Sequence, residues 1–229
     1  MLQTETIEFF RELRQNNHKD WFDLNRPRYE QVKKDYQNLV AEILSQLQKF
    51  DGDLAHLQIK DCTFRINRDL RFTKDKRPYK THLSMVFTPF GRKMDYAGYY
   101  VHLDEVEGSF VGGGIYMPPG EILKKVRYEV SVFYEDLQAI LDDPDFKTVY
   151  GNFDRTADIL LTRPPKGYSV DDPALEYLKL KSFTASRDFP ASRLRKKEAI
   201  EETVKELSAL RPLIRFLNRS LRAEGPPVL

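Results

Sequence analysis

Hydrophobic side chains recur at helical spacing near both ends of the chain. Ile7, Phe10 and Leu13 follow one another at three-residue intervals, which predicts an amphipathic helix over residues 5–15. A longer apolar stripe predicts a second helix that begins after Asn25. The members of that stripe are Tyr29, Val32, Tyr36, Leu39, Val40, Ile43, Leu44 and Leu47.

Two more helical stripes lie in the second half of the chain. One begins after Pro118-Pro119-Gly120 and extends to Leu141, and the other covers about residues 191–220. Pro212 should kink or divide the last helix, because proline removes a backbone donor and clashes with the preceding turn.

The middle third changes from helical to alternating periodicity. "CTFRINRDLRF" alternates, which predicts a strand with Arg65, Asn67, Asp69 and Arg71 on one face and Phe64, Ile66, Leu70 and Phe72 on the other. A "KDKRP" turn follows, and residues 81–90, 97–106 and 108–117 then alternate as three further strands, with 181–189 as another candidate. Short strands joined by short turns predict an antiparallel meander. We therefore expect one α+β domain over residues 1–229, in which a central antiparallel β-meander packs with N-terminal and C-terminal helices.

Composition restricts the class of protein further. The 229 residues are 41% hydrophobic, which is enough for a folded core, and no continuous apolar run is long enough for a membrane helix. The N-terminal segment reads as an amphipathic helix rather than a signal peptide. A single cysteine, Cys62, excludes an intramolecular disulfide framework. We expect a cytoplasmic protein without a membrane partner.

Positive charge is concentrated in one segment, residues 64–82, "FRINRDLRFTKDKRPYKTH". This segment holds seven basic and two acidic side chains, a net charge of +5, whereas the rest of the chain has 30 basic and 33 acidic residues, a net charge of −3. The molecule as a whole carries only +2. Because the excess is local, it indicates an anionic partner for this segment rather than general binding of polyanions.

Motifs for several common chemistries are missing from the sequence. The four histidines, His18, His56, His82 and His102, show no metal-ligand spacing, and one cysteine cannot build a zinc site. No nucleophile elbow, Walker loop or H-E-x-x-H motif occurs. Two Asp-Asp-Pro clusters are better explained as helix caps than as metal carboxylates. We expect no metal and no cofactor.

The basic segment carries the candidate binding chemistry. We expect an anion site formed by Arg65, Arg68, Arg71, Lys74, Lys76 and Lys80. Guanidinium groups that share a strand face can grip a phosphate or carboxylate in bidentate fashion, so the partner would be an anionic small molecule or nucleic acid. Arg68 departs from the alternation and needs a carboxylate, a bulge or a cavity. A second basic segment, "SRLRKK", near the start of the last helix gives weaker support.

Two other interpretations of the basic segment remain open. The chain could be an enzyme that acts on a small anionic substrate, with Asp69, Tyr79 or His82 as the acid–base group. Alternatively, the arginines could form a purely structural network with carboxylates of the chain and bind no ligand. The lysines of the turn are also consistent with a role in preventing aggregation through exposed strand edges.

Long motifs resemble an uncharacterised family of bacteria and fungi, the domain of unknown function 2461. The N-terminal pattern is matched by Asn16, Asn17, Trp21, Phe22, Asn25 and Tyr29. The central pattern is matched by Arg65, Arg68, Asp69, Arg71, Phe72, Lys74, Asp75, Lys76, Pro78, Tyr79 and Lys80. The resemblance implies a single domain, and it brings no activity, substrate or catalytic residue. It leaves the ligand, the reaction and the oligomeric state open.

Overall fold

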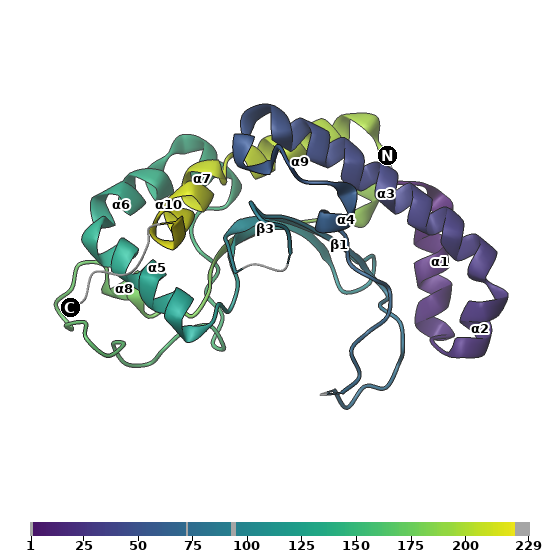
Figure 1. The fold of residues 1–229 in the computed structure, drawn as a ribbon, viewed down its shortest axis with the longest axis horizontal. Helices are drawn as coiled ribbons and strands as arrows, with labels where there is room; N and C mark the ends of the chain where they lie inside the picture. Colours follow the sequence, from purple (N-terminus) through teal and green to yellow (C-terminus); the bar gives the residue numbers. More distant parts are fainter. Residues whose placement is uncertain (1, 72, 93–94, 223–229) are drawn as a thin grey trace. The chain divides into compact units, whose positions relative to one another are not determined.

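A computed structural model describes residues 2–71, 73–92 and 95–222 of the chain. These residues form ten α-helices and a four-stranded antiparallel sheet, which confirms the α+β class (Figure 1). The helices are α1 (Thr4–Gln15), α2 (Lys19–Leu24), α3 (Arg26–Phe50), α4 (Ile59–Cys62), α5 (Gly120–Val132), α6 (Tyr134–Asp142), α7 (Pro144–Val149), α8 (Leu175–Leu178), α9 (Lys197–Ser208) and α10 (Arg211–Arg222).

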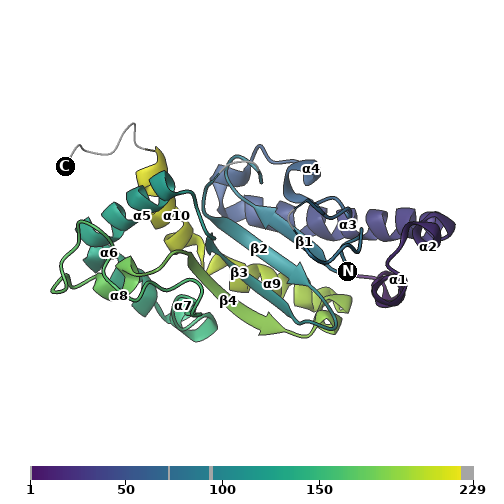
Figure 2. The same cartoon turned by 90° about the horizontal axis from the view of Figure 1, so that it is seen from below.

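The strands follow one another in space in the order in which they occur in the sequence. They are β1 (Leu83–Phe87), β2 (Gly98–Leu103), β3 (Ser109–Ile115) and β4 (Phe183–Phe189), in the order β1-β2-β3-β4 (Figure 2). In β3, a Cβ atom on Gly113 would lie 2.6 Å from the Gly98 carbonyl oxygen. The glycines of this strand therefore permit close approach of the neighbouring backbone, as glycine in a strand often does.

The described residues divide into two compact units, each built from three segments of the chain. Unit 1 takes its residues from Met1–Phe87, Tyr100–Val111 and Asp188–Lys205, and unit 2 from Thr88–Tyr99, Gly112–Arg187 and Glu206–Leu229. The expectation of a single domain stays a prediction.

Unit 1 contains an aromatic core that joins the first three helices. Phe9 and Leu13 of α1, Phe22 of α2 and Val32 of α3 are buried together with Tyr79. The rings of Phe22 and Tyr79 stack with centroids 4.0 Å apart. Helix α3 also packs on β1, where the buried Tyr36 hydroxyl donates to the Ser84 carbonyl. The apolar stripe predicted for α3 is thus the face that packs into the core.

Unit 2 is mainly helical, and α5 packs against α10 within it. Asn218 of α10 is fully buried and bonds both backbone groups of Ala97, donating to the carbonyl at 3.0 Å and accepting from the N–H at 2.8 Å. The Arg127 guanidinium of α5 donates to the carbonyls of Leu178 and Leu180 at 2.8 and 3.0 Å. Buried and half-buried polar side chains of this unit therefore satisfy backbone groups of neighbouring segments.

The predicted strand over residues 62–72 is wrong. Among the described residues of this range, only isolated bridges occur, between Thr63 and Met85 and between Asn67 and Tyr79. Figure 1 shows the segment between α4 and β1 as a long loop that extends away from β1. The side chains of Asp69 and Asp75 accept hydrogen bonds from backbone N–H groups that pairing between strands would otherwise use. Phe72, which was assigned to the apolar face, lies outside the described residues.

The two long C-terminal stripes each form more than one helix. The stripe that ends at Leu141 is divided at Phe133 into α5 and α6, a break that the periodicity did not predict. The last stripe divides into α9 and α10 with Pro212 in the first turn of α10, which confirms the predicted division. Among the described residues, no helix is both long and apolar enough to span a membrane.

Candidate functional site

The positively charged segment, residues 64–82, is a hairpin whose base is held firmly and is called the basic hairpin below. Close to the base, the Arg68 N–H donates to the Pro78 carbonyl at 2.9 Å, and the Lys80 N–H donates to the Ile66 carbonyl at 2.8 Å. The Asn17 side chain bonds both backbone groups of Tyr79, at 2.9 and 3.0 Å. The base of the hairpin is thus attached to the segment after α1.

A repeated Asp-x-Arg pattern shapes the outer part of the basic hairpin. Asp69 accepts from the backbone N–H of Arg71 at 3.1 Å, and Asp75 accepts from the backbone N–H of Arg77 at 3.0 Å. Such bonds from an aspartate to the residue two positions ahead are characteristic of turns. They compete with strand pairing for the same N–H groups, which is the physical reason for the lost alternation.

The same two aspartates form ion pairs with arginines of the hairpin. Asp75 contacts both Arg68 and Arg77 at 2.7 Å, and Asp69 contacts Arg71 at 2.6 Å. The hydrogen bond from the Arg77 side chain is the main cause that lowers the pKa of Asp75 far below its usual range. The hydrogen bond from the Arg71 side chain is the main cause that lowers the pKa of Asp69 to about 2. Of the three alternatives for Arg68, a carboxylate partner, a bulge or a cavity, the structure shows a carboxylate partner, Asp75.

The other cations of the basic hairpin differ in their surroundings. Arg65 and Lys74 are exposed and have no ion-pair or hydrogen-bond partner among the described residues. Lys76 is exposed and donates to the Leu70 carbonyl at 3.1 Å, and it has no carboxylate partner in the described part of the chain. Lys80 is half-buried, with its ammonium 5.0 Å from the centre of the Phe64 ring. Arg65, Lys74 and Lys76 thus form no ion pair with a carboxylate among the described residues, although Arg65 lies near enough to Asp69 to help lower the pKa of that carboxyl.

The three candidate acid–base groups lie in different environments. Asp69 is exposed and bound to Arg71, whereas the Tyr79 ring is buried in the aromatic core. His82 is half-buried beside His102, with ring centroids 4.7 Å apart. Burial, then the neighbouring His102 and Lys80, lower the pKa of His82 to about 4, so its ring is neutral at pH 7. The structure does not bring these three groups into one cluster.

Sequence reasoning missed the contact between His82 and His102. The two residues are far apart in the sequence, but β1 and β2 are neighbours, so their side chains meet on one face of the sheet. Burial also lowers the pKa of His102. Asp104, two residues after His102, completes a group of possible metal ligands. Alternation in two adjacent strands was the available signal, but it requires the strand register to be known.

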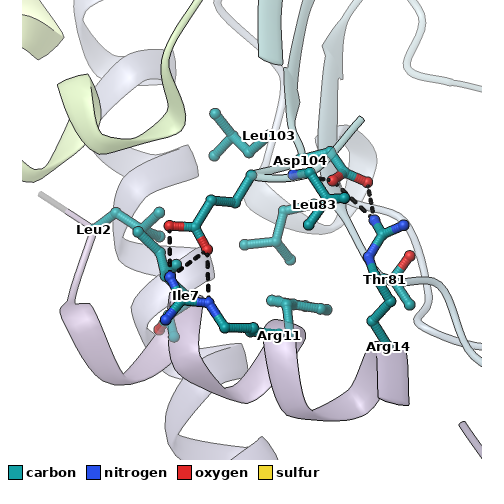
Figure 3. A pocket seen from close by; sticks show the side chains of 12 residues that line it. Leu2, Ile7, Arg11, Arg14, Thr81, Leu83, Leu103 and Asp104 are labelled. Carbon is teal, nitrogen blue, oxygen red and sulfur yellow. Dashed lines mark hydrogen bonds and ion pairs between the residues drawn. The ribbon is translucent and has the colours of Figure 1, made fainter. Parts of the chain in front are cut away.

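A small cleft lies between α1 and the turn after β2 (Figure 3). Leu2, Ile7, Leu83 and Leu103 give it apolar walls, and Figure 3 shows Arg11 and Arg14 reaching across it toward carboxylates. Arg11 contacts Glu105 at 2.8 Å, and Arg14 contacts Asp104 at 2.6 Å. Its volume of about 30 Å³ is suited to water rather than to a substrate, because ligand pockets usually measure hundreds of Å³.

A second group of arginines lies in unit 2, along α10. Arg211, Arg215, Arg219 and Arg222 line an open groove of about 610 Å³ together with residues of α6. Arg219 contacts Glu129 and also Asp136, the latter at 3.1 Å. Arg215 is exposed and has no partner among the described residues. This groove is called the α10 groove below.

The second basic segment is partly neutralised within unit 1. Arg193 contacts Glu202 at 3.3 Å, and Arg195 lies 3.7 Å from Glu105. The side chain of Lys197 lies outside the described part of the structure. This segment therefore adds less unneutralised charge than its sequence suggested.

Comparison with known proteins gives one match. The model of a family described as "Conserved hypothetical protein (DUF2461)" matches residues 5–216, and this range includes the whole basic hairpin. No curated protein and no solved structure matches the chain.

Proposed function

The chain belongs to the DUF2461 family of conserved hypothetical proteins, and we propose that it binds nucleic acid through the phosphate backbone, with the basic hairpin as the contact. The observation that carries this proposal is the division of the hairpin cations into two sets. Arg68, Arg71 and Arg77 are paired with Asp75 and Asp69. The second set, Arg65, Lys74 and Lys76, is exposed without carboxylate partners in the described part of the chain.

The two sets have different roles in this proposal. The paired arginines hold the outer part of the hairpin in its turns, which agrees with the structural interpretation for these residues. The unpaired cations are available to phosphates, and the net charge of +5 on the segment attracts a polyanion from solution. Sequence-independent affinity for nucleic acid arises mainly from such contacts between cations and phosphates.

The shape of the site favours a polymer over a small substrate. The pocket that Arg65 and Lys80 line has a volume of about 30 Å³, too small for a substrate molecule. The hairpin instead extends away from the strands of unit 1 (Figure 1). Exposed cations on an extended segment suit a ligand with repeated charges, which nucleic acid has.

The candidate acid–base groups favour binding over catalysis at the hairpin. Asp69, with its pKa near 2, is a weak base that already accepts hydrogen bonds from Arg71. The Tyr79 ring is stacked on Phe22 and is 7% exposed. Efficient acid–base catalysis needs a group with a pKa near the working pH and within reach of the substrate.

Fluorescence anisotropy with labelled DNA tests the proposal directly. We expect the wild-type protein to bind a short duplex and a single strand of the same sequence at low salt. The variant with Arg65→Gln, Lys74→Gln and Lys76→Gln should bind at least tenfold more weakly to both. The matched control is Lys124→Gln, which removes an exposed charge from a surface pair in unit 2, and it should bind as the wild type does.

Three outcomes would contradict the proposal. Equal affinity of the triple variant and the wild type would remove the hairpin from the site, and loss of binding in Arg211→Gln/Arg215→Gln alone would place the site in the α10 groove. Stronger binding to vesicles containing phosphatidylserine than to DNA would identify a membrane surface as the partner instead. Circular dichroism of every variant verifies that the fold is retained.

A further inference from the structure

Three potential metal ligands meet on the sheet of unit 1, next to the base of the basic hairpin. They are His82, which precedes β1, His102 of β2, and Asp104, which follows β2. One ligand atom from each of the three lies within 4.8 Å of the others. Both histidines are half-buried, and Asp104 is 3% exposed, so the group is partly shielded from solvent.

His102 is oriented by a hydrogen bond to a neighbouring strand. Its Nδ1 lies 2.9 Å from the Ser84 hydroxyl of β1. When this nitrogen donates its proton to Ser84, the Nε2 atom keeps a lone pair for a metal ion. Metal-binding histidines usually have their second ring nitrogen fixed by such a partner. Ser84 is 7% exposed, which protects this bond from competing water.

Asp104 is fixed in place by the turn after β2 and by α1. Its Oδ1 accepts from the backbone N–H groups of Val106 and Glu107 at 2.8 and 2.9 Å, and from Arg14 at 2.8 Å. Its Oδ2 accepts only from Arg14, at 2.6 Å, in the described part of the structure. A carboxylate oxygen has two lone pairs, so Oδ2 can still coordinate a cation. Arg14 also contacts Glu107, at 2.7 Å, and this carboxylate offsets part of the electrostatic effect of the guanidinium on the group.

We propose that His82, His102 and Asp104 form a binding site for a divalent transition-metal ion, with Zn²⁺ as the best-suited ion. Two imidazoles and one carboxylate are a ligand set that Zn²⁺ accepts, and the fourth position is left for water or a further ligand. Zinc–ligand distances of about 2.0–2.2 Å place tetrahedral ligand atoms about 3.4 Å apart. The ligand atoms, now within 4.8 Å of one another, would have to move closer together to reach this spacing when a metal ion binds.

His82 is the last residue of the basic hairpin, but the ligands of this site differ from the cations of the proposed nucleic-acid contact. None of its three ligands is among Arg65, Lys74 and Lys76, so either site can fail without the other. Alkaline-earth ions are poorer candidates, because Mg²⁺ and Ca²⁺ prefer oxygen ligands to imidazole.

Titration of the full chain with Zn²⁺ tests the proposal. Isothermal titration calorimetry should give one Zn²⁺ per chain, and Co²⁺ should give visible absorption typical of coordination by protein nitrogen. His82→Gln and His102→Gln should each weaken Zn²⁺ binding by more than tenfold. Ser84→Ala, which removes only the partner of His102, should weaken it by about 10- to 100-fold. The matched control is His56→Gln, which changes an exposed histidine outside the group.

Other results would overturn the proposal. Unchanged Zn²⁺ affinity in both His82→Gln and His102→Gln would mean that the protein binds metal adventitiously elsewhere, and absence of stoichiometric binding by the wild type would exclude the site. Far-UV circular dichroism without metal separates loss of binding from loss of fold. Long-range ¹H–¹⁵N NMR spectra of the histidine rings give a second readout, since Zn²⁺ should shift the Nε2 resonance of His102 and leave that of His56 unchanged.

Discussion

The salt dependence of DNA binding measures how many phosphates the basic hairpin neutralises. In the described part of the chain, three exposed cations of the hairpin lack a carboxylate partner, namely Arg65, Lys74 and Lys76. Each phosphate neutralised on duplex DNA contributes about −0.9 to the slope of log K against log salt concentration, so three contribute about −2.7. A fourfold rise in salt should then weaken duplex binding about 40-fold through these residues alone.

The triple variant provides the comparison for this slope. Wild-type protein and the variant with Arg65→Gln, Lys74→Gln and Lys76→Gln are titrated against a labelled duplex by fluorescence anisotropy at several salt concentrations. Their slopes should differ by about 2.7, and each single substitution should change the slope by about 0.9. On single-stranded DNA the difference should fall to about 2.1, because single strands release fewer counterions.

Slopes of the two proteins that agree within about 0.5 would contradict this prediction. That result would show that the three side chains do not contact phosphates, even if the triple variant bound less tightly for another reason. The Lys124→Gln control should leave the slope unchanged, since its pairing with Glu121 is exposed and remote in sequence from the hairpin. A changed slope in the control would mean that the salt effect depends on the net charge of the protein rather than on the cations of the hairpin.

The remaining predictions concern the ion pairs of the hairpin and the packing of the sheet. The carboxyl carbon of Asp69 should titrate in NMR spectra with a midpoint of about 2, and Arg71→Gln should return this midpoint toward 3.8. The contribution of this ion pair to stability is then present above about pH 4 and lost as the pH falls toward 2. An unchanged midpoint in the variant would contradict the pairing. Asp75→Asn weakens the bonds to Arg68 and Arg77, so it should speed amide hydrogen exchange across the hairpin. The melting temperature should fall by no more than a few degrees. Unaltered exchange would show that the ion pairs of Asp75 do not order the hairpin. Gly114→Ala should lower the free energy of unfolding in urea by at least about 2 kcal/mol, because φ is +117° and a Cβ would overlap the Phe183 carbonyl. Gly108→Ala, where φ is +105° and the surroundings are open, should cost less, and equal losses would mean that the backbone conformation alone determines the effect.

Periodicity predicted most of the fold because local burial follows it. The stripe on α3 and the alternation in β1, β2 and β3 are visible in the sequence and match the structure to within a few residues. The helix-cap prediction is confirmed for one of the two Asp-Asp-Pro clusters and wrong for the second, because α8 begins at Leu175 with Ala174 as N-cap and no side-chain cap bond. Asp143 caps α7 with Pro144 in the first turn, accepting from the N–H groups of Asp145 and Phe146.

Alternation misled the prediction in the basic hairpin because another local preference competed with it. Asp69 and Asp75 bond the backbone N–H two residues ahead, and the arginines at those positions fold back onto the same carboxylates. A strand pattern alone does not include this competition. The repeated Asp-x-Arg spacing was the signal that a turn interpretation would have used.

The candidate site was only partly accessible from the sequence because its contacts depend on tertiary structure. The excess of charge in residues 64–82 was visible, but not which cations pair internally. The meeting of His82, His102 and Asp104 depends on the register of β1 against β2, which the sequence pattern does not specify on its own. Contacts between residues that are distant in the sequence can be identified only once the fold is known.

The most direct test of the central claim is to map the DNA contact on the full chain by NMR. Addition of a short duplex to ¹⁵N-labelled protein at low salt should shift the amide resonances of the described hairpin residues 64–71 and 73–80, with the strongest changes at Arg65, Lys74 and Lys76. The resonances of α10 should remain in place. Shifts confined to α10, or a hairpin whose resonances do not move while DNA binds, would contradict the assignment of the basic hairpin as the nucleic-acid contact.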